Sequence, residues 1–126
     1  MKKELSEIFG GIDIYLFDKI IRGRFDCVKK VLDVGCGSGI NLKYLAEHGV
    51  DVYGIDKSET TIDRIRAIYE NIPTCNFRVA TADNLPYETD HFDAVICNAV
   101  LHFADNDNHF DKMIKEIWRV IAPGGV

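Results

Sequence analysis

The stretch Val31-Leu32-Asp33-Val34-Gly35-Cys36-Gly37-Ser38-Gly39, continued by residues 40–48, decides the fold. Three apolar residues around one acid predict a short buried strand, and glycines at alternate positions predict a sharp turn after it. The next residues carry apolar side chains at helical spacing. A strand that runs through a glycine turn into a helix is typical of a cofactor-binding corner, because the glycines expose main-chain atoms and the first N–H groups of the helix are left as donors. A tight turn without a ligand is the alternative.

Strand and helix patterns alternate along the rest of the chain. Strands are predicted at 31–34, 50–55, 76–80 and 92–97, and helices at 40–48, 59–69 and 110–121. Such strands can only be joined by crossovers, so we expect an α/β domain with a parallel sheet in the order 3-2-1-4 and helices on both faces. The glycine turn should lie at the switch point between strands 1 and 4. In the last helix we expect the aromatic residues Phe110 and Trp118 to belong to the core.

Composition limits the classes of partner. The chain has 126 residues, 47% of them hydrophobic, and a formal net charge of −5 with scattered basic residues, so nucleic acid is a poor candidate. No apolar run approaches the length of a membrane span, and we expect neither secretion nor membrane insertion. The cysteines lack zinc-ligand spacing and predict reduced thiols in a cytoplasmic protein without a metal site: Cys27, Cys36, Cys75 and Cys97.

Further motifs follow the glycine turn in a fixed order. They are Gly54-Ile55-Asp56, Ala82-Asp83-Asn84-Leu85-Pro86, Phe92-Asp93-Ala94-Val95-Ile96-Cys97-Asn98 and Ala122-Pro123-Gly124-Gly125. Together with the glycine turn, these motifs resemble class I S-adenosylmethionine-dependent methyltransferases over residues 31–126. The resemblance implies a Rossmann-like fold and is greatest to the small-molecule branch, which includes ubiquinone/menaquinone and tellurite methyltransferases. Asn41 is similar to the tellurite type and Asp83–Pro86 to the quinone type, so the methyl acceptor stays open.

Two acids are predicted to bind the adenosyl group of the cofactor, S-adenosyl-L-methionine. Asp56 ends the second strand, where an ionised carboxylate can accept hydrogen bonds from both ribose hydroxyls. The resemblance implies that Asp83 accepts a bond from the adenine amino group while neighbouring main chain reads the ring edge. A surface acid beside a helix and an acid that forms a turn are the respective alternatives.

The methionine half of the cofactor is expected beside the glycine turn. Asp33 can attract the cofactor ammonium directly or through water, and without such a partner its burial would be costly. The resemblance places Asn98 close to the same half. The predicted cofactor-binding residues are therefore Asp33, Gly35, Cys36, Gly37, Asp56, Lys57, Ala82, Asp83, Asn84 and Asn98.

The reaction that the resemblance implies is methyl transfer from a sulfonium to a small-molecule acceptor by in-line displacement. A catalytic base is needed only if the acceptor carries a proton near neutral pH. His102 is the best candidate, although a packed or solvated histidine is the simpler interpretation, so the catalytic residues stay unknown. His91 and His109 lie in polar loop sequence and give no argument for catalysis.

Two other functions are left open. A nicotinamide-dependent oxidoreductase would need a glycine where this chain has Ile40. A non-catalytic module that only holds the adenosyl cofactor is not excluded by any residue.

The chain also departs from the family at its end. Full-length members continue after the Pro-Gly-Gly turn into a fifth strand and further elements that often form much of the acceptor pocket, whereas this sequence stops at Val126. We therefore expect one domain, 1–126, that begins with a helical extension at 1–26 and carries mainly the cofactor-binding half. Methyl transfer by this chain should be negligible, and the open edge of the fourth strand favours self-association.

Overall fold

A computed structural model describes residues 27–97 and 106–123. The expected N-terminal extension, Asn98 and His102 lie outside these ranges. The strands are β1 (Lys30–Val34), β2 (Asp51–Asp56), β3 (Phe77–Val79) and β4 (Ala94–Cys97). The helices are α3 (Lys43–Glu47), α4 (Glu59–Ile68) and α5 (Asp107–Val120), with short 3₁₀ turns η1 (Ile40–Leu42) and η2 (Thr74–Asn76).

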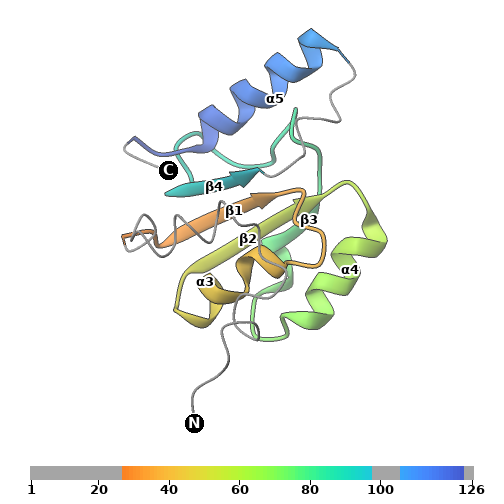
Figure 1. Cartoon of the computed structure of the whole chain (residues 1–126), viewed down its shortest axis with the longest axis vertical. Helices are drawn as coiled ribbons and strands as arrows, with labels where there is room; N and C mark the ends of the chain where they lie inside the picture. The colour runs from red at the N-terminus through yellow and green to blue at the C-terminus, as the bar shows by residue number, and fades with distance from the viewer. Residues whose placement is uncertain (1–26, 98–105, 124–126) are drawn as a thin grey trace.

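The strands form one parallel sheet in the order β3-β2-β1-β4, as the sequence predicts (Figure 1). The chain places β2 and β3 successively on one side of β1 and then crosses over to place β4 on the other side. The switch point of the strand order therefore lies between β1 and β4. Asp33 lies in β1, one of the two inner strands, opposite Gly54 of β2 and Ile96 of β4. The carboxyl ends of the strands meet at one edge, where ligands bind in sheets of this kind.

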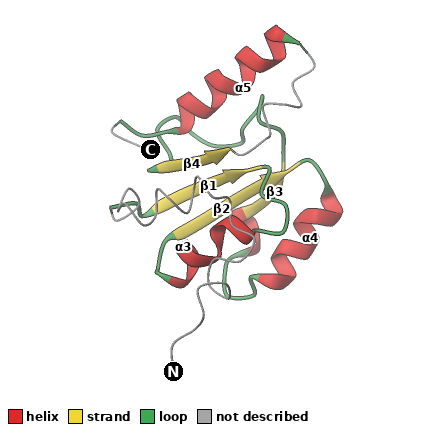
Figure 2. Cartoon of the chain, in the orientation of Figure 1, coloured by secondary structure: helices red, strands yellow, loops and turns green. Residues whose placement is uncertain are grey.

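Helices cover both faces of the sheet (Figure 2). On one face, Leu42, Leu45, Ile62 and Ile65 from η1, α3 and α4 pack in a buried cluster with Val31 and other strand residues. On the other face, Met113 and Val120 of α5 pack on residues of β1 and β2 such as Leu32 and Ile55. Strand residues therefore alternate between two apolar clusters, which is why their sequences read as continuous apolar runs.

The connection from β3 to β4, residues 80–93, contains no helix. Its Tyr87, His91 and Phe92 form an aromatic cluster with Tyr53 of β2, and the ring centroids of Tyr87 and Phe92 lie 4.9 Å apart. Leu85 and Phe92 are buried in the cluster that α5 covers. Aromatic side chains thus pack this connection against β2.

The predicted helix at 40–48 is shorter and begins as a 3₁₀ turn. The amide of Leu42 donates to the carbonyl of Gly39 at 2.9 Å, which is a bond across three residues, and only Lys43–Glu47 is α-helical. The hydroxyl of Tyr69 donates to the same Gly39 carbonyl at 2.6 Å. This second donor holds the carbonyl at the start of the helix.

The outer edge of the fourth strand is not bare along its whole length, and this part of the expectation is wrong. Phe92 forms a parallel bridge with Ile121, just after α5. Its amide donates to the carbonyl of Val120 at 2.8 Å, and its carbonyl accepts from Ala122 at 2.7 Å. Regular β4 begins only at Ala94. The segment after α5 therefore covers the outer edge of the chain at Phe92, just before β4 begins.

The expectation that the aromatic residues of α5 are core is also wrong. Trp118 is 71% exposed and Phe110 is 42% exposed. The face of the helix that packs on the sheet instead carries Met113, Ile117 and Val120 at helical spacing. None of the helices within 27–97 and 106–123 is long and apolar enough to cross a membrane.

Candidate functional site

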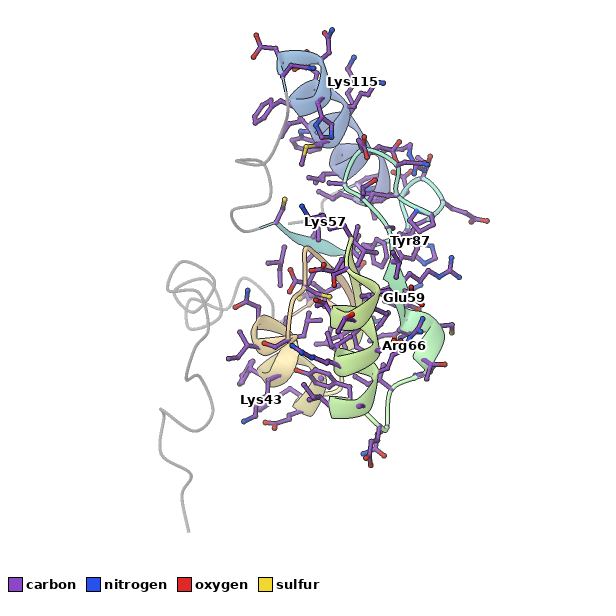
Figure 3. The ribbon with its side chains drawn as sticks, turned by 90° about the vertical axis from the view of Figure 1, so that its right-hand side faces the viewer. Lys43, Lys57, Glu59, Arg66, Tyr87 and Lys115 are labelled. Atoms are coloured by element: carbon purple, nitrogen blue, oxygen red, sulfur yellow. The ribbon has the colours of Figure 1, made fainter. Side chains whose placement is uncertain are left out.

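A cleft of about 720 Å³ lies at the carboxyl edge of the sheet, a size within the range of about 300–1,000 Å³ that is common for ligand sites. The ends of β1 and β2, the turn after β3 and the first turns of α5 form its walls. Figure 3 shows Lys57 between the sheet and α5. The predicted residues that line the cleft are Gly35, Asp56, Lys57, Ala82 and Asp83.

The glycine turn is tied to the end of β2. The amides of Gly35 and Cys36 both donate to the carbonyl of Ile55, at 2.8 and 2.9 Å. Farther along the turn, Gly39 has a φ of +79°, and a Cβ there would lie 2.6 Å from Cδ1 of Ile65 and 2.7 Å from Cε2 of Tyr69. Only glycine fits this position, so α4 packs directly on the backbone of the turn.

Asp56 is held by main-chain donors on both of its carboxylate oxygens. Its Oδ2 accepts from the amide of Gly37 at 3.3 Å, and its Oδ1 accepts from the amide of Ser58 at 3.0 Å. Ser58 in turn caps α4 by accepting from the amide of Thr61. A carboxylate has about four acceptor positions, so each oxygen can accept a further bond from a ligand in the cleft.

Asp83 lines the cleft in the turn after β3 and contacts α5. Its Oδ1 accepts from the hydroxyl of Thr81 at 2.6 Å, and its Oδ2 lies 3.3 Å from Nε2 of His109. The Thr81 hydrogen bond is the largest cause that lowers the pKa of Asp83, with smaller contributions from the positive charges of His109 and Lys112. Asp83 is therefore a carboxylate acceptor at neutral pH.

Asp33 does not line the cleft but lies buried next to it. The residue is 1% exposed, and its Oδ2 has no hydrogen-bond partner. Burial raises its pKa from 3.8 to about 7, and the negative charge of Asp56 adds to the rise. An acid in this state is stabilised by a positively charged or hydrogen-bonding ligand group, so the residue fits an ammonium directly or through water.

Cys36 contributes its side chain to the core rather than to the cleft. Its thiol is buried, and a Cβ on Gly54 would lie 2.9 Å from its Sγ. Burial, with the charges of Asp33 and Asp56, raises the pKa of the thiol to about 12. Cys36 is therefore a neutral packing residue at neutral pH.

Glu116 and Arg119 of α5 hold the loop that carries Asp83. Glu116 Oε2 accepts from the amide of Leu85 at 3.0 Å and pairs with Arg119 Nη2 at 2.8 Å. Arg119 donates to the carbonyls of Leu85 and Tyr87 at 3.0 and 2.8 Å. These bonds satisfy the main chain of an irregular loop and fix it to the helix.

Sequence reasoning missed the wall that α5 contributes. This wall consists of Asn106, Asn108, His109, Lys112 and Met113. The available signal was the polar run 106–109 at the start of a helix, because a helix that follows a strand begins at the carboxyl edge of the sheet. Asn84 lies slightly apart, in a neighbouring hollow that it shares with Lys57 and Arg78.

The fold and the cleft define a Rossmann-like domain with a candidate ligand site at the carboxyl edge of its sheet. Residues 32–126 match a protein family described as "Methyltransferase domain", and the chain belongs to this family. The match confirms the resemblance that the ordered motifs indicate. It gives no support to the nicotinamide-dependent alternative.

Individual relatives are methyltransferases by name. The chain is 36% identical over 100 residues to a ubiquinone biosynthesis O-methyltransferase of Acinetobacter baumannii (strain ACICU). The matched region covers 77% of this chain and 41% of that protein. It is 33% identical over 98 residues to an uncharacterized methyltransferase of Synechocystis, covering 78% of this chain and 44% of that protein. The chain thus spans less than half the length of these curated relatives.

A solved structure gives the same picture. A SAM-dependent methyltransferase of Methanosarcina mazei superposes with a TM-score of 0.69 and 29% sequence identity, covering 81% of this chain and 51% of that one. This superposition supports the fold and the strand order given above.

Proposed function

We propose that this domain binds S-adenosylmethionine in the cleft and serves methyl transfer to a small-molecule acceptor. The observation that carries the proposal is that two carboxylates, Asp56 and Asp83, line one cleft together with Gly35 of the glycine turn. Membership in the methyltransferase domain family supports it.

Each part of the cofactor has a group in this chain that can hold it. Asp56 would accept from the ribose hydroxyls, since its oxygens are already oriented by main-chain donors. Asp83 would accept from the adenine amino group, with the main chain of Ala82 and Asn84 beside the ring. The unpartnered Oδ2 of Asp33 would face the ammonium directly or through one water.

The bound cofactor would supply an activated methyl group on a sulfonium. The protein would then orient the methyl donor and the acceptor and exclude water from the site. The relative from Acinetobacter baumannii is named an O-methyltransferase, so an oxygen nucleophile is the first acceptor class to test. His102 stays the candidate base for an acceptor that carries a proton.

We also propose that the protein is cytoplasmic and that its partner is a small molecule. All four cysteines lie in the described ranges and are free, which suits a reducing cytoplasm. The net charge of −5 favours a small acceptor over a nucleic acid.

We further propose that the edge of β4 pairs with a second copy of the chain. The Phe92 amide and carbonyl point away from β1, and strand alternation directs those of Ala94 and Ile96 to the same side. Within 27–97 and 106–123, only the segment after α5 pairs with this edge, and it does so at Phe92. Light scattering over a range of concentrations should show dimers, and a monomer throughout would contradict this part.

Calorimetric titration of the chain with S-adenosylmethionine, S-adenosylhomocysteine and NAD tests the main proposal. We expect both adenosyl ligands to bind and NAD to fail. Asp56→Ala removes two hydrogen bonds to a charged acceptor, each of which is worth about 1.5–3 kcal/mol before water compensates. The adenosyl ligands should therefore bind much more weakly to this variant.

Asp63→Ala is the matched control, because Asp63 is an acid of α4 that is 67% exposed and that forms a loose pair with Arg66 at 3.8 Å. It removes the same charge without touching the cleft. Equal binding by wild type and Asp56→Ala, or binding of NAD alone, would overturn the assignment.

A further inference from the structure

His109 and Asp83 both line the cleft and contact each other there. It lies in the first turn of α5, which begins at the same edge of the sheet as the strand ends (Figure 1). The side chain of Asn106 accepts from the His109 amide at 2.9 Å, so the helix cap fixes the position of this residue. The two side chains are 27% and 32% exposed, and Nε2 lies 3.3 Å from Oδ2.

The two oxygens of Asp83 have different partners. Oδ1 accepts from Thr81, which lies in the same turn, whereas Oδ2 contacts His109 of α5. Asp83 and His109 both line the cleft, so an amino group that binds Oδ2 would share this oxygen with the imidazole. We propose that His109 competes with the adenosyl ligand for Asp83, so that the contact between the imidazole and Oδ2 weakens when the ligand binds. This inference rests on the proposed function.

The competition should depend on pH. An imidazole changes charge between about pH 5 and about pH 8, whereas Asp83 is ionised throughout this range. The other charged groups that face this part of the cleft are Lys112 of α5 and, from the end of β2, Asp56 and Lys57. A protonated His109 forms an ion pair with Asp83 and opposes the ligand, and a neutral one opposes it less. Ligand affinity should therefore rise with pH.

The size of the effect follows from exposure. Ion pairs between partly exposed side chains change an equilibrium by about two- to fivefold. His109→Ala should bind S-adenosylhomocysteine about two- to fivefold more tightly than wild type at about pH 5.5, and the two affinities should converge at about pH 8. Asp33 and the ligand's own groups titrate in both proteins, so their contributions cancel in the ratio.

The experiment is calorimetric titration with S-adenosylhomocysteine at both pH values. His48→Ala is the control, because His48 is an exposed histidine at the end of α3 that stacks on Tyr44, away from the cleft. Its affinities should follow those of wild type. Circular dichroism should show an unchanged fold for both variants, since each replaced side chain is partly exposed.

The outcomes separate this inference from the proposed function. If His109→Ala binds more weakly than wild type, His109 supports the ligand and the competition is refuted. If the ratio of affinities is the same at both pH values, the ion pair is not the cause and the inference fails while the proposed function stands. If neither variant nor wild type binds the ligand, the proposed function itself fails.

Discussion

Replacing the buried acid Asp33 by asparagine should change the pH dependence of folding. The pKa of Asp33 rises from 3.8 to about 7 on folding, chiefly through burial and secondly through the charge of Asp56. The folded state therefore holds the proton more tightly than the unfolded state does. The bound proton therefore stabilises the folded state fully below the pKa of the unfolded state, 3.8. This stabilisation is lost as pH rises through the pKa of the folded state, about 7.

The magnitude follows from proton linkage. Between about pH 5 and about pH 8, a shift of this size removes about 2–3 kcal/mol from the free energy of unfolding. The asparagine of Asp33→Asn cannot ionise, so the free energy of unfolding of this variant does not fall in this way as pH rises. The new amide group brings a cost of about 1–3 kcal/mol if its N–H groups stay unpaired, but this cost does not vary with pH. The difference between the two proteins should therefore shift by about 2–3 kcal/mol in favour of the variant as pH rises.

Urea unfolding followed by far-ultraviolet circular dichroism at several pH values measures this difference. Asp63→Asn, an exposed replacement of the same kind, should run parallel to wild type at every pH. A constant difference between wild type and Asp33→Asn would refute the reasoning. It would mean that Asp33 is already ionised and paired in the absence of a ligand.

Two other replacements test how the site is held. Gly39→Ala should cost about 2–5 kcal/mol of stability, because it combines a left-handed backbone with a Cβ 2.6 Å from Ile65. Gly49→Ala has a similar φ of +82° but open space around its Cβ and should cost only about 1–2 kcal/mol; equal losses in urea unfolding would show that packing on α4 is unimportant. Arg119→Ala should cost about 1–3 kcal/mol by releasing the carbonyls of the loop after β3. Arg119→Lys should recover only part of this loss, because lysine lacks the planar fork, and full recovery would contradict that role for the guanidinium.

The sequence alone determined the order of the elements and the topology of the sheet. Apolar runs at 31–34 and 50–55, separated by a glycine turn and a helical pattern, allow only parallel strands joined by crossovers. The glycine turn also located the edge of the sheet that carries the cleft, and Asp56 could be placed there because it ends a strand. These features depend on local spacing, which a sequence displays directly.

Contacts between distant segments were decided only by the tertiary structure. The sequence does not show that His109 lies against Asp83, or that Arg119 binds the loop that carries it. It also gave the wrong burial for Trp118, since amphipathic spacing marks an apolar stripe but not which part of it meets the sheet. The missing partner of Asp33 is likewise a property of packing. The physical reason is that burial and hydrogen bonding depend on which surfaces meet after folding, and no local pattern records that choice.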